Sequence, residues 1–348
     1  GKYFMELLTR PTLETDEVIT CFRDGEVTLR SKRREEGFTV SLTEAGYQGI
    51  EIGDLVVHGM DGFAGSIGIS DSRGKATPVL NVLDTEQNKR YMMYLMRTMA
   101  YCELFLSLAT GIRVRTCDTN WKKLREIDYI LPTIPEQKAI ADFLDEQCAE
   151  IDSLISDIQS QIEALEEYKR SVITEAVTKG LDPDVEMRDS GVQWIGMMPT
   201  HWDCQRGKYL LRYVQKPVRD DDGVITCFRD GEVTLRSNRR EEGFTMADKE
   251  IGYQGIDVGD LVVHGMDGFA GSIGISDSRG KASPVLNVLD TEQNKRYIMY
   301  YLRSMAYNDV FVALATGIRV RSCDLRWNKL AELLYPMPPV EEQQAIVE

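Results

Sequence analysis

Apolar residues recur every three or four positions between Thr133 and Gly180, the longest regular pattern in the chain. This heptad spacing is typical of a helix that packs against another helix. The positions form an apolar seam, which comprises Leu144, Cys148, Ile151, Ile155, Ile158, Ile162, Leu165, Val172 and Ala176, with Lys169 as a charged interruption. Since charged residues occupy much of the remaining surface, we expect the seam to need a second helix, although an ordinary long core helix is the alternative.

Signals at both ends define this helix. Thr133 and Glu136 have capping-box spacing, and Pro135 falls in the first turn, where its missing N–H costs nothing. Gly180 suits a left-handed cap, and Pro183 prevents continuation. About 44 residues at about 1.5 Å each predict a rod about 65 Å long.

The rest of the chain is an internal repeat. Gly1-Lys2-Tyr3 recurs as Gly207-Lys208-Tyr209, and the same offset of 206 positions relates Cys21 to Cys227 without a gap. The match is closest between residues 47–88 and 253–294. A period of this length means two copies of a whole domain rather than a solenoid.

Each copy combines short strands with one helix. In the first copy we predict strands over residues 17–22, 55–58 and 78–83, a hairpin turn at Asp24-Gly25, and a helix over 91–108. The predicted fold class is α+β, with two repeated domains of mixed, mainly antiparallel sheet plus helices, joined by the long helix. The predicted division is 1–132 first domain, 133–180 long helix, 181–206 connector packing on the second domain, 207–338 second domain, and 339–348 start of a second long helix. Because that helix has only begun at Glu348, and Gly1 lacks the Trp-bearing lead-in that precedes Gly207, we expect that residues are missing at both ends.

Composition describes a globular protein without a membrane span. The chain is 43% hydrophobic and 28% charged, and no apolar run is long enough to cross a bilayer. Seven cysteines without a C-x-x-C pair and the absence of a secretory signal favour reduced thiols in a cytoplasmic protein. With only three histidines, a zinc site is not expected. The net charge of −15 argues at first against nucleic acid, but net charge does not locate a binding face.

Candidate chemistry is binding rather than catalysis. No phosphate-binding P-loop, dinucleotide fingerprint or nucleophile elbow is present. Basic residues instead cluster in loops of both copies, where arginine and lysine suit phosphate oxygens and guanine edges, and solvated salt bridges are the alternative. The candidate DNA-binding residues are Arg30, Lys32, Arg33, Arg34, His58, Arg73, Lys75, Arg113 and Arg115 in the first copy, and Arg236, Asn238, Arg239, Arg240, His264, Arg279, Lys281, Arg319 and Arg321 in the second. For the two histidines, which end buried strands, packing is favoured over base contact.

Four segments carry a resemblance to a known family. They are 134–144, which begins Ile-Pro-Glu-Gln-Lys-Ala-Ile, 151–155, 177–183 and 189–196, the last reading Asp-Ser-Gly-Val-Gln-Trp-Ile-Gly. With two flanking lobes, this pattern resembles the specificity subunit of Type I restriction-modification systems, with two near-identical target-recognition domains. The chain departs from the family pattern because its second long helix is not completed.

The resemblance implies a non-catalytic DNA-recognition subunit. Each lobe would read one half of a bipartite site in double-stranded DNA, and two antiparallel helices would set the spacer. Two modification subunits would bring S-adenosylmethionine and flip adenines for N6 methylation, and a motor-nuclease restriction subunit would join for cleavage. No cofactor is expected on this chain. Two near-identical lobes predict an interrupted palindrome as the target.

Two other functions remain open at this point. One is a coiled-coil scaffold with two protein-binding lobes, which salt-dependent binding to one bipartite duplex would distinguish from a DNA reader. The other is a fused restriction enzyme, which the absence of nuclease and methyltransferase motifs disfavours.

Overall fold

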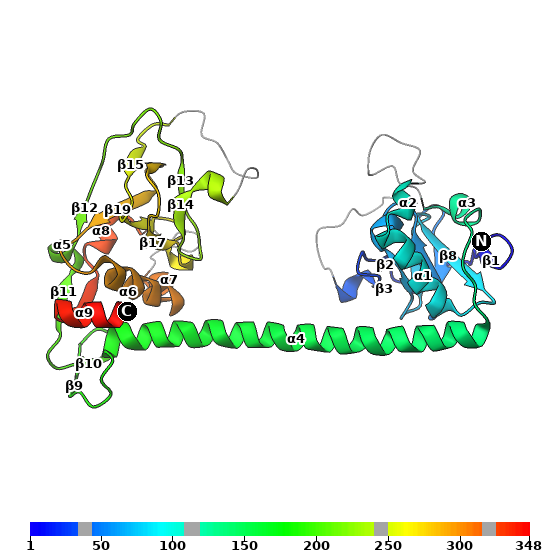
Figure 1. Ribbon diagram of the computed structural model, residues 1–348, viewed down its shortest axis with the longest axis horizontal. Coiled ribbons are helices and arrows are strands. Elements are labelled where there is room, and N and C mark those ends of the chain that lie inside the picture. Colours follow the sequence, from blue (N-terminus) through cyan, green and yellow to red (C-terminus); the bar gives the residue numbers. More distant parts are fainter. Residues whose placement is uncertain (34–43, 108–118, 240–249, 315–324) are drawn as a thin grey trace. The chain divides into compact units, whose positions relative to one another are not determined.

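The computed structural model describes residues 1–33, 44–107, 119–239, 250–314 and 325–348. Two compact units divide the chain, unit 1 over Gly1–Asp157 and unit 2 over Ile158–Glu348. The boundary falls inside helix α4 (Ile134–Lys179), which therefore contributes its first half to unit 1 and its second half to unit 2 (Figure 1). Helix and antiparallel sheet are mixed in both units, so the α+β prediction is confirmed.

Unit 1 is built on a four-stranded antiparallel sheet in the order β1-β8-β5-β6. Its strands are β1 (Met5–Leu7), β5 (Leu55–His58), β6 (Ile67–Ile69) and β8 (Leu80–Thr85). Two smaller pairs join β2 (Ile19–Cys21) to β3 (Val27–Leu29) and β4 (Gln48–Ile50) to β7 (Gly74–Ala76). The helical elements are η1 (Arg30–Lys32), η2 (Gly62–Ala64), α1 (Lys89–Tyr101), α2 (Leu104–Ser107) and α3 (Trp121–Leu124).

The alternation of side chains along β5 explains the two hydrophobic cores of unit 1. Leu55 and Val57 point into a core shared with Met92 and Met96 of α1. Val56 points to the opposite face, where it packs with residues of the two smaller pairs. Because successive side chains of a strand face opposite sides, one sheet is covered on both faces.

Unit 2 repeats this arrangement after the second half of α4. Its main sheet has the order β12-β19-β16-β17, and its strands are β12 (Arg212–Tyr213), β16 (Leu261–His264), β17 (Ile273–Ile275) and β19 (Leu286–Asp290). The smaller pairs are β13 (Ile225–Cys227) with β14 (Val233–Leu235) and β15 (Gln254–Ile256) with β18 (Gly280–Ala282). The helical elements are α5 (Gly207–Leu210), η4 (Arg236–Asn238), η5 (Gly268–Ala270), α6 (Lys295–Tyr307), α7 (Val310–Ala313), α8 (Trp327–Leu330) and α9 (Val340–Val347).

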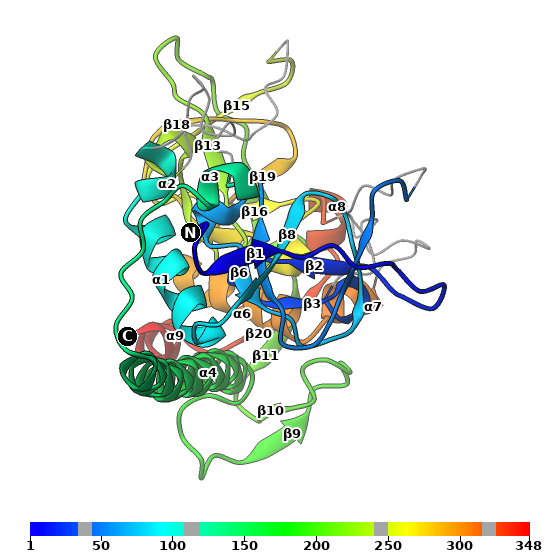
Figure 2. The same cartoon turned by 90° about the vertical axis from the view of Figure 1, so that its right-hand side faces the viewer.

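The connector contributes three strands to unit 2. β9 (Met187–Asp189) pairs with β10 (Met197–Pro199), and this hairpin lies on the opposite side of the end of α4 from the main sheet of unit 2 (Figures 1 and 2). β11 (Asp203–Arg206) pairs antiparallel with β20 (Leu334–Met337). Trp202 is fully buried in the unit 2 core. The connector is thus part of the folded second unit.

Helix α4 begins and ends where its capping residues predict. Thr133 donates to the Glu136 carboxylate from its backbone N at 2.9 Å and from its hydroxyl at 2.7 Å. Gly180 follows the last turn with a φ of +79°, a left-handed conformation that favours glycine. The seam is exposed, with Ile155 at 60% and Leu165 at 66% exposure.

One helix prediction was too long. The spacing over residues 91–108 predicted a single helix, but α1 ends at Tyr101 and α2 begins at Leu104. Glu103 between them has a positive φ of 58°, so the backbone turns there. The apolar spacing continues through the break because both helices bury residues in one core, which makes the break invisible to periodicity.

Candidate nucleic-acid interface

Arg33 and Arg239 occupy equivalent, partly exposed positions beside the first hairpin of each unit. The Arg33 guanidinium lies 4.3 Å from the ring centre of Phe22, and its Nη1 pairs with Asp24 at 2.7 Å and Glu26 at 3.0 Å. Among the described residues, its Nε and Nη2 make no hydrogen bond. Stacking and the two carboxylates therefore hold the guanidinium in one orientation while part of its donor fork remains available.

The second unit reproduces this geometry. Arg239 lies 4.3 Å from the Phe228 ring and pairs with Asp230 at 2.6 Å and Glu232 at 2.9 Å. Both hairpin turns also contain a glycine that adopts positive φ, Gly25 at 91° and Gly231 at 90°. The same presentation of arginine therefore occurs twice in the chain.

Two further arginines join each hairpin and were not among the sequence-based candidates. Arg97 of α1 donates to the carbonyl of Asp24 at 2.6 Å, and Arg23 pairs with Asp61 at 2.9 Å. The Arg23 side chain is 70% exposed, as is that of Arg229 in unit 2. Both arginines recur in the second copy, as Arg229 and Arg303, and this recurrence could have identified them from the sequence. They were missed because they lie outside the runs of basic residues.

Arg30 and Lys32 lie on η1, the short helix that follows the hairpin of unit 1, and Arg236 and Asn238 lie on its counterpart η4. Arg30 donates to the Thr20 hydroxyl at 3.1 Å, as Arg236 does to Thr226. Lys32 pairs with Asp71 at 3.1 Å and also donates to Ser72. Its counterpart Asn238 instead donates to Thr234 at 2.8 Å. This position is where the two candidate surfaces differ most.

Arg73 and Lys75 are engaged inside their unit. Arg73 pairs with Asp16 at 3.2 Å and with Glu51, and Lys75 pairs with Glu44 at 2.6 Å. The Lys75 side chain is only 14% exposed. Arg279 and Lys281 form the matching pairs with Asp222 at 3.0 Å and Glu250 at 2.7 Å. Arg73 and Arg279 each neutralise a nearly buried aspartate, and DNA contact by these four residues stays a prediction.

His58 shapes a turn. Its Nδ1 accepts hydrogen bonds from the backbone N of Met60 at 3.3 Å and of Asp61 at 3.0 Å, and His264 does the same for Met266 and Asp267. Burial lowers the pKa of both imidazoles from their ordinary value. Each ring is therefore neutral near pH 7, with its proton on Nε2.

The remaining candidates, Arg34, Arg113, Arg115, Arg240, Arg319 and Arg321, lie outside the described residues. The candidate interface that can be placed consists of the hairpin arginines and the turns beside them.

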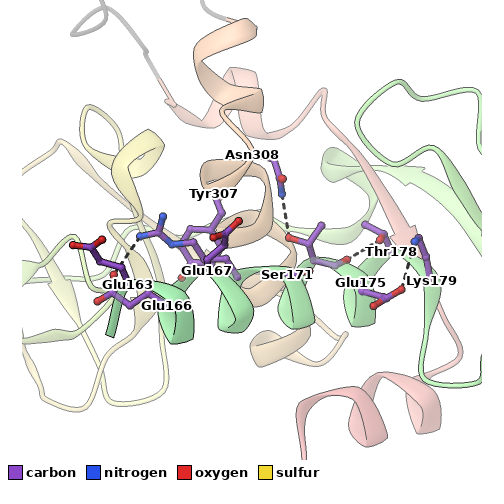
Figure 3. A pocket seen from close by; sticks show the side chains of 11 residues that line it. Glu163, Glu166, Glu167, Ser171, Glu175, Thr178, Lys179, Tyr307 and Asn308 are labelled. Atoms are coloured by element: carbon purple, nitrogen blue, oxygen red, sulfur yellow. Dashed lines mark hydrogen bonds and ion pairs between the residues drawn. The ribbon is translucent and has the colours of Figure 1, made fainter. Parts of the chain in front are cut away.

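A large hollow in unit 2 has the wrong charge for a phosphate backbone. It measures about 700 Å³ and lies between the second half of α4 and the end of α6 (Figure 3). Four of its lining residues are acidic, namely Glu163, Glu166, Glu167 and Glu175. Arg170 lies 5.5 Å from the ring centre of Tyr307, and Asn308 donates to Thr174 at 3.1 Å, so these contacts join α4 to α6. We therefore place no nucleic-acid contact there.

Other site types lack support in the part of the chain that the structure describes. No cluster of three or more His, Cys, Asp or Glu side chains that could hold a metal ion occurs among the residues placed. No helix in the described ranges combines the length and apolar character needed to cross a bilayer.

Comparison with known proteins gives a match in sequence. No protein-family model matches the chain. A protein of Methanocaldococcus jannaschii that bears the name of the type I restriction enzyme MjaX specificity subunit is 30% identical over 129 residues. Over these residues the chain is similar to a protein named as a type I specificity subunit. The match spans 36% of this chain and 28% of that relative, so the chain covers little more than a quarter of the relative's length.

Solved structures of type I systems have a similar fold. A chain from a study of complex assembly and conformational transition of the type I restriction-modification system aligns with a TM-score of 0.59 at 14% identity, over 86% of this chain and 73% of that one. The HsdS subunit of Thermoanaerobacter tengcongensis aligns with a TM-score of 0.44 at 14% identity, over 86% of this chain and 72% of that subunit. The first alignment shows that the fold of this chain, two sheet-rich domains linked by a long helix, is similar to that of a chain from a type I system.

Proposed function

We propose that this chain is the non-catalytic DNA-recognition subunit of a type I restriction-modification complex. Its two lobes would each read one half of a bipartite site in double-stranded DNA. The observation that carries the proposal is the twofold occurrence of a stacked, carboxylate-held arginine beside an exposed hairpin, in a chain similar in part to a protein named as a specificity subunit. Arginine presented in this way suits the O6 and N7 atoms of guanine in the major groove.

The local charge favours base contacts over phosphate contacts for Arg33 and Arg239. Each has two carboxylates within 3.0 Å, which would repel a phosphate. The net charge of −15 is compatible with base contacts by these arginines, because other subunits of a complex can supply the phosphate contacts. The proposed partners are two modification subunits, which would carry S-adenosylmethionine and methylate adenine at N6, and a restriction subunit.

Selection from a random pool of duplexes tests the proposal. We expect the enriched duplexes to carry two short fixed segments separated by an unspecified spacer of constant length, and binding to weaken as salt rises. The same chain with both Arg33 and Arg239 replaced by alanine is the control and should lose the enrichment. Enrichment of no fixed bases by the wild-type chain would favour the scaffold function instead.

A further inference from the structure

Asp71 and Asp277 hold equivalent carboxylates beside the two hairpins. The backbone N of each aspartate donates to the carbonyl of the first residue in the second hairpin strand, at 3.1 Å in unit 1 and 3.0 Å in unit 2. One carboxylate oxygen of each accepts from the hydroxyl of the next serine, Ser72 at 2.5 Å and Ser278 at 2.6 Å. The two carboxylates are therefore held at the same place in each unit by the same local contacts.

A lysine neutralises the carboxylate of unit 1. The second oxygen of Asp71 accepts from the Lys32 ammonium at 3.1 Å and from the Thr28 hydroxyl at 3.0 Å. The same ammonium donates to the Ser72 hydroxyl at 2.9 Å, so two of its three N–H groups are engaged. Half of each charged side chain is exposed, 50% for Lys32 and 49% for Asp71. Unit 1 thus presents a neutral pair that can still donate one hydrogen bond to a ligand.

The carboxylate of unit 2 has no such partner. Asn238 stands at the position of Lys32, and its amide donates to the Thr234 hydroxyl at 2.8 Å. Within the ranges that the structure describes, Asp277 forms no ion pair, and the Ser278 hydroxyl is the one side chain that donates to its carboxylate. Asp277 is exposed. Unit 2 therefore presents an acceptor that keeps its negative charge.

These carboxylates border the candidate interface. Lys32 directly precedes Arg33, and Arg33 pairs with Glu26 at 3.0 Å. Glu26 and Thr28 are two positions apart along the hairpin, so their side chains lie on the same side of it. Because Thr28 donates to Asp71, the stacked arginine and the carboxylate follow one another along this side. A DNA edge that contacts one of them would lie next to the other.

The free carboxylate and the lysine–carboxylate pair select opposite groups on a base edge. An ionised carboxylate only accepts hydrogen bonds, so it repels phosphate oxygens and the O6 and N7 atoms of guanine. It can accept from the N4 amino group of cytosine. The amino group of adenine is less suitable, because the acceptor N7 lies beside it in the major groove. The remaining N–H donor of the lysine suits guanine instead.

We propose that Asp277 is a specificity-determining residue of unit 2, where it accepts from the N4 amino group of a cytosine in the major groove. At the equivalent position of the other half-site, the Lys32–Asp71 pair of unit 1 takes a guanine. This inference rests on the proposed DNA-recognition function and adds the identity of one base to it. Its consequence is a single inverted G·C pair between two half-sites that are otherwise alike. Position 32 or 238 decides the base because it determines whether the neighbouring carboxylate is neutralised.

Exchange of the two residues between the units tests the proposal. Because each exchange alters one unit, it should change one half-site and leave the other as it is. Selection of duplexes by Asn238→Lys should give a strict palindrome with guanine at this position, and Lys32→Asn should give a strict palindrome with cytosine. Titration of fluorescent duplexes that differ only at this base pair should show the preference shifting by at least about fivefold in each variant.

Asp277→Asn is the second variant, because it keeps the shape of the side chain and removes its charge. An amide donates and accepts side by side and so matches the N6 and N7 atoms of adenine. The preference should therefore move from cytosine to adenine in one half-site. Asp184→Asn removes an equal charge from an exposed residue of the connector and should leave the selected sequence unchanged. The substituted side chains are exposed, so all variants should keep the thermal midpoint of the wild type.

The outcomes separate this inference from the function on which it rests. A cytosine preference that persists in Asp277→Asn overturns the inference and leaves DNA recognition in place. An unchanged selected sequence in both exchange variants does the same. Selection of no fixed bases by the wild-type chain overturns the proposed function together with this inference.

Discussion

Each proposed DNA contact rests on how an arginine is held. Arg33 and Arg239 are stacked on phenylalanine and tied to two carboxylates, whereas Arg73 and Arg279 neutralise buried aspartates. The sequence-based prediction treated these arginines alike, because the sequence shows the residue type but not the partners of its side chain. Only the partners that the fold brings near each guanidinium separate an available donor from a structural one.

Replacement of Arg33 by alanine should weaken specific DNA binding by about 1–3 kcal/mol and relax the base preference at one position of a half-site. Arg33→Lys should not restore the preference, because lysine lacks the planar donor fork. Titration of fluorescent duplexes that vary at each position measures both effects. Arg125→Ala, which removes an equal charge from an exposed site elsewhere in unit 1, should leave binding unchanged. An unaltered base preference in Arg33→Ala would show that this hairpin does not read DNA.

The ion pairs of unit 2 predict a dependence of stability on acid. Hydrogen bonds from Arg279 and then Lys216 lower the pKa of Asp257 to about 2. Since an unfolded aspartate titrates near about 3.9, the stabilisation is present above that pH and is lost as the pH falls toward 2. The thermal midpoint of unit 2 should therefore drop between about pH 4 and pH 2 by less in Asp257→Asn than in the wild type. Equal drops in the two proteins would mean that Asp257 does not contribute to acid unfolding.

The element that links the two units is one helix of 46 residues with an exposed apolar seam. Its caps lie in the linear sequence, and its seam needs another helix to cover it. The first part of the helix is fixed to unit 1, where the Gln137 side chain accepts from the Asn88 nitrogen at 3.0 Å and Arg90 pairs with Asp142 and Asp145. In unit 2, Val177 of the same helix belongs to the core. Such a helix, anchored at both ends, suits the role of a spacer.

Insertion of one heptad between Ile151 and Val172 should lengthen the DNA spacer by about three base pairs. Seven residues add about 10 Å at about 1.5 Å each, and one base pair spans about 3.4 Å. The heptad keeps the seam in register, and the helix that pairs with it needs the same insertion. Selection of duplexes by the lengthened protein measures the spacer, and insertion of four residues, which rotates the seam, is the control. A spacer that stays constant would show that the helices do not set it.

At the scale of the whole molecule, the repeat is preserved in its contacts as well as in its sequence. The stacked arginines, the turn-forming histidines and the positive-φ glycines recur at equivalent positions with nearly equal distances. Lys32 and Asn238 are the main exception among the candidate residues that the structure describes. Two such lobes are expected to read nearly the same short sequence.

The target should therefore be an interrupted palindrome, in which a short half-site, an unspecified spacer and the reverse complement of the half-site follow one another. In the specificity-subunit family that the sequence resembles, antiparallel helices relate the two lobes by a twofold axis. A DNA-binding protein with twofold symmetry binds a site with the same symmetry. Mapping N6-methyladenine across the host genome would measure the site. Asn238→Lys should make the two half-sites more alike if this position accounts for any difference between them. Half-sites of unrelated sequence would contradict the prediction.

Local sequence patterns were enough to predict the long helix, one strand of the main sheet and the internal repeat. The capping residues and heptad spacing predicted α4, observed over Ile134–Lys179, and strand β5 falls on the predicted residues 55–58. Local signals suffice here because caps, turns and periodicity act over a few neighbouring residues. The repeat likewise required only comparison of the chain with itself.

Tertiary structure alone decided the rest. It set Arg73 and Arg279 against nearly buried aspartates, broke the helix at Glu103, and paired β20 with the connector. None of these follows from spacing, because each depends on residues distant in sequence that meet only in the fold. The same local sequence therefore produced the same hairpin in both copies, whereas the ion pairs of Arg73 and Arg279 needed carboxylates from distant parts of the chain.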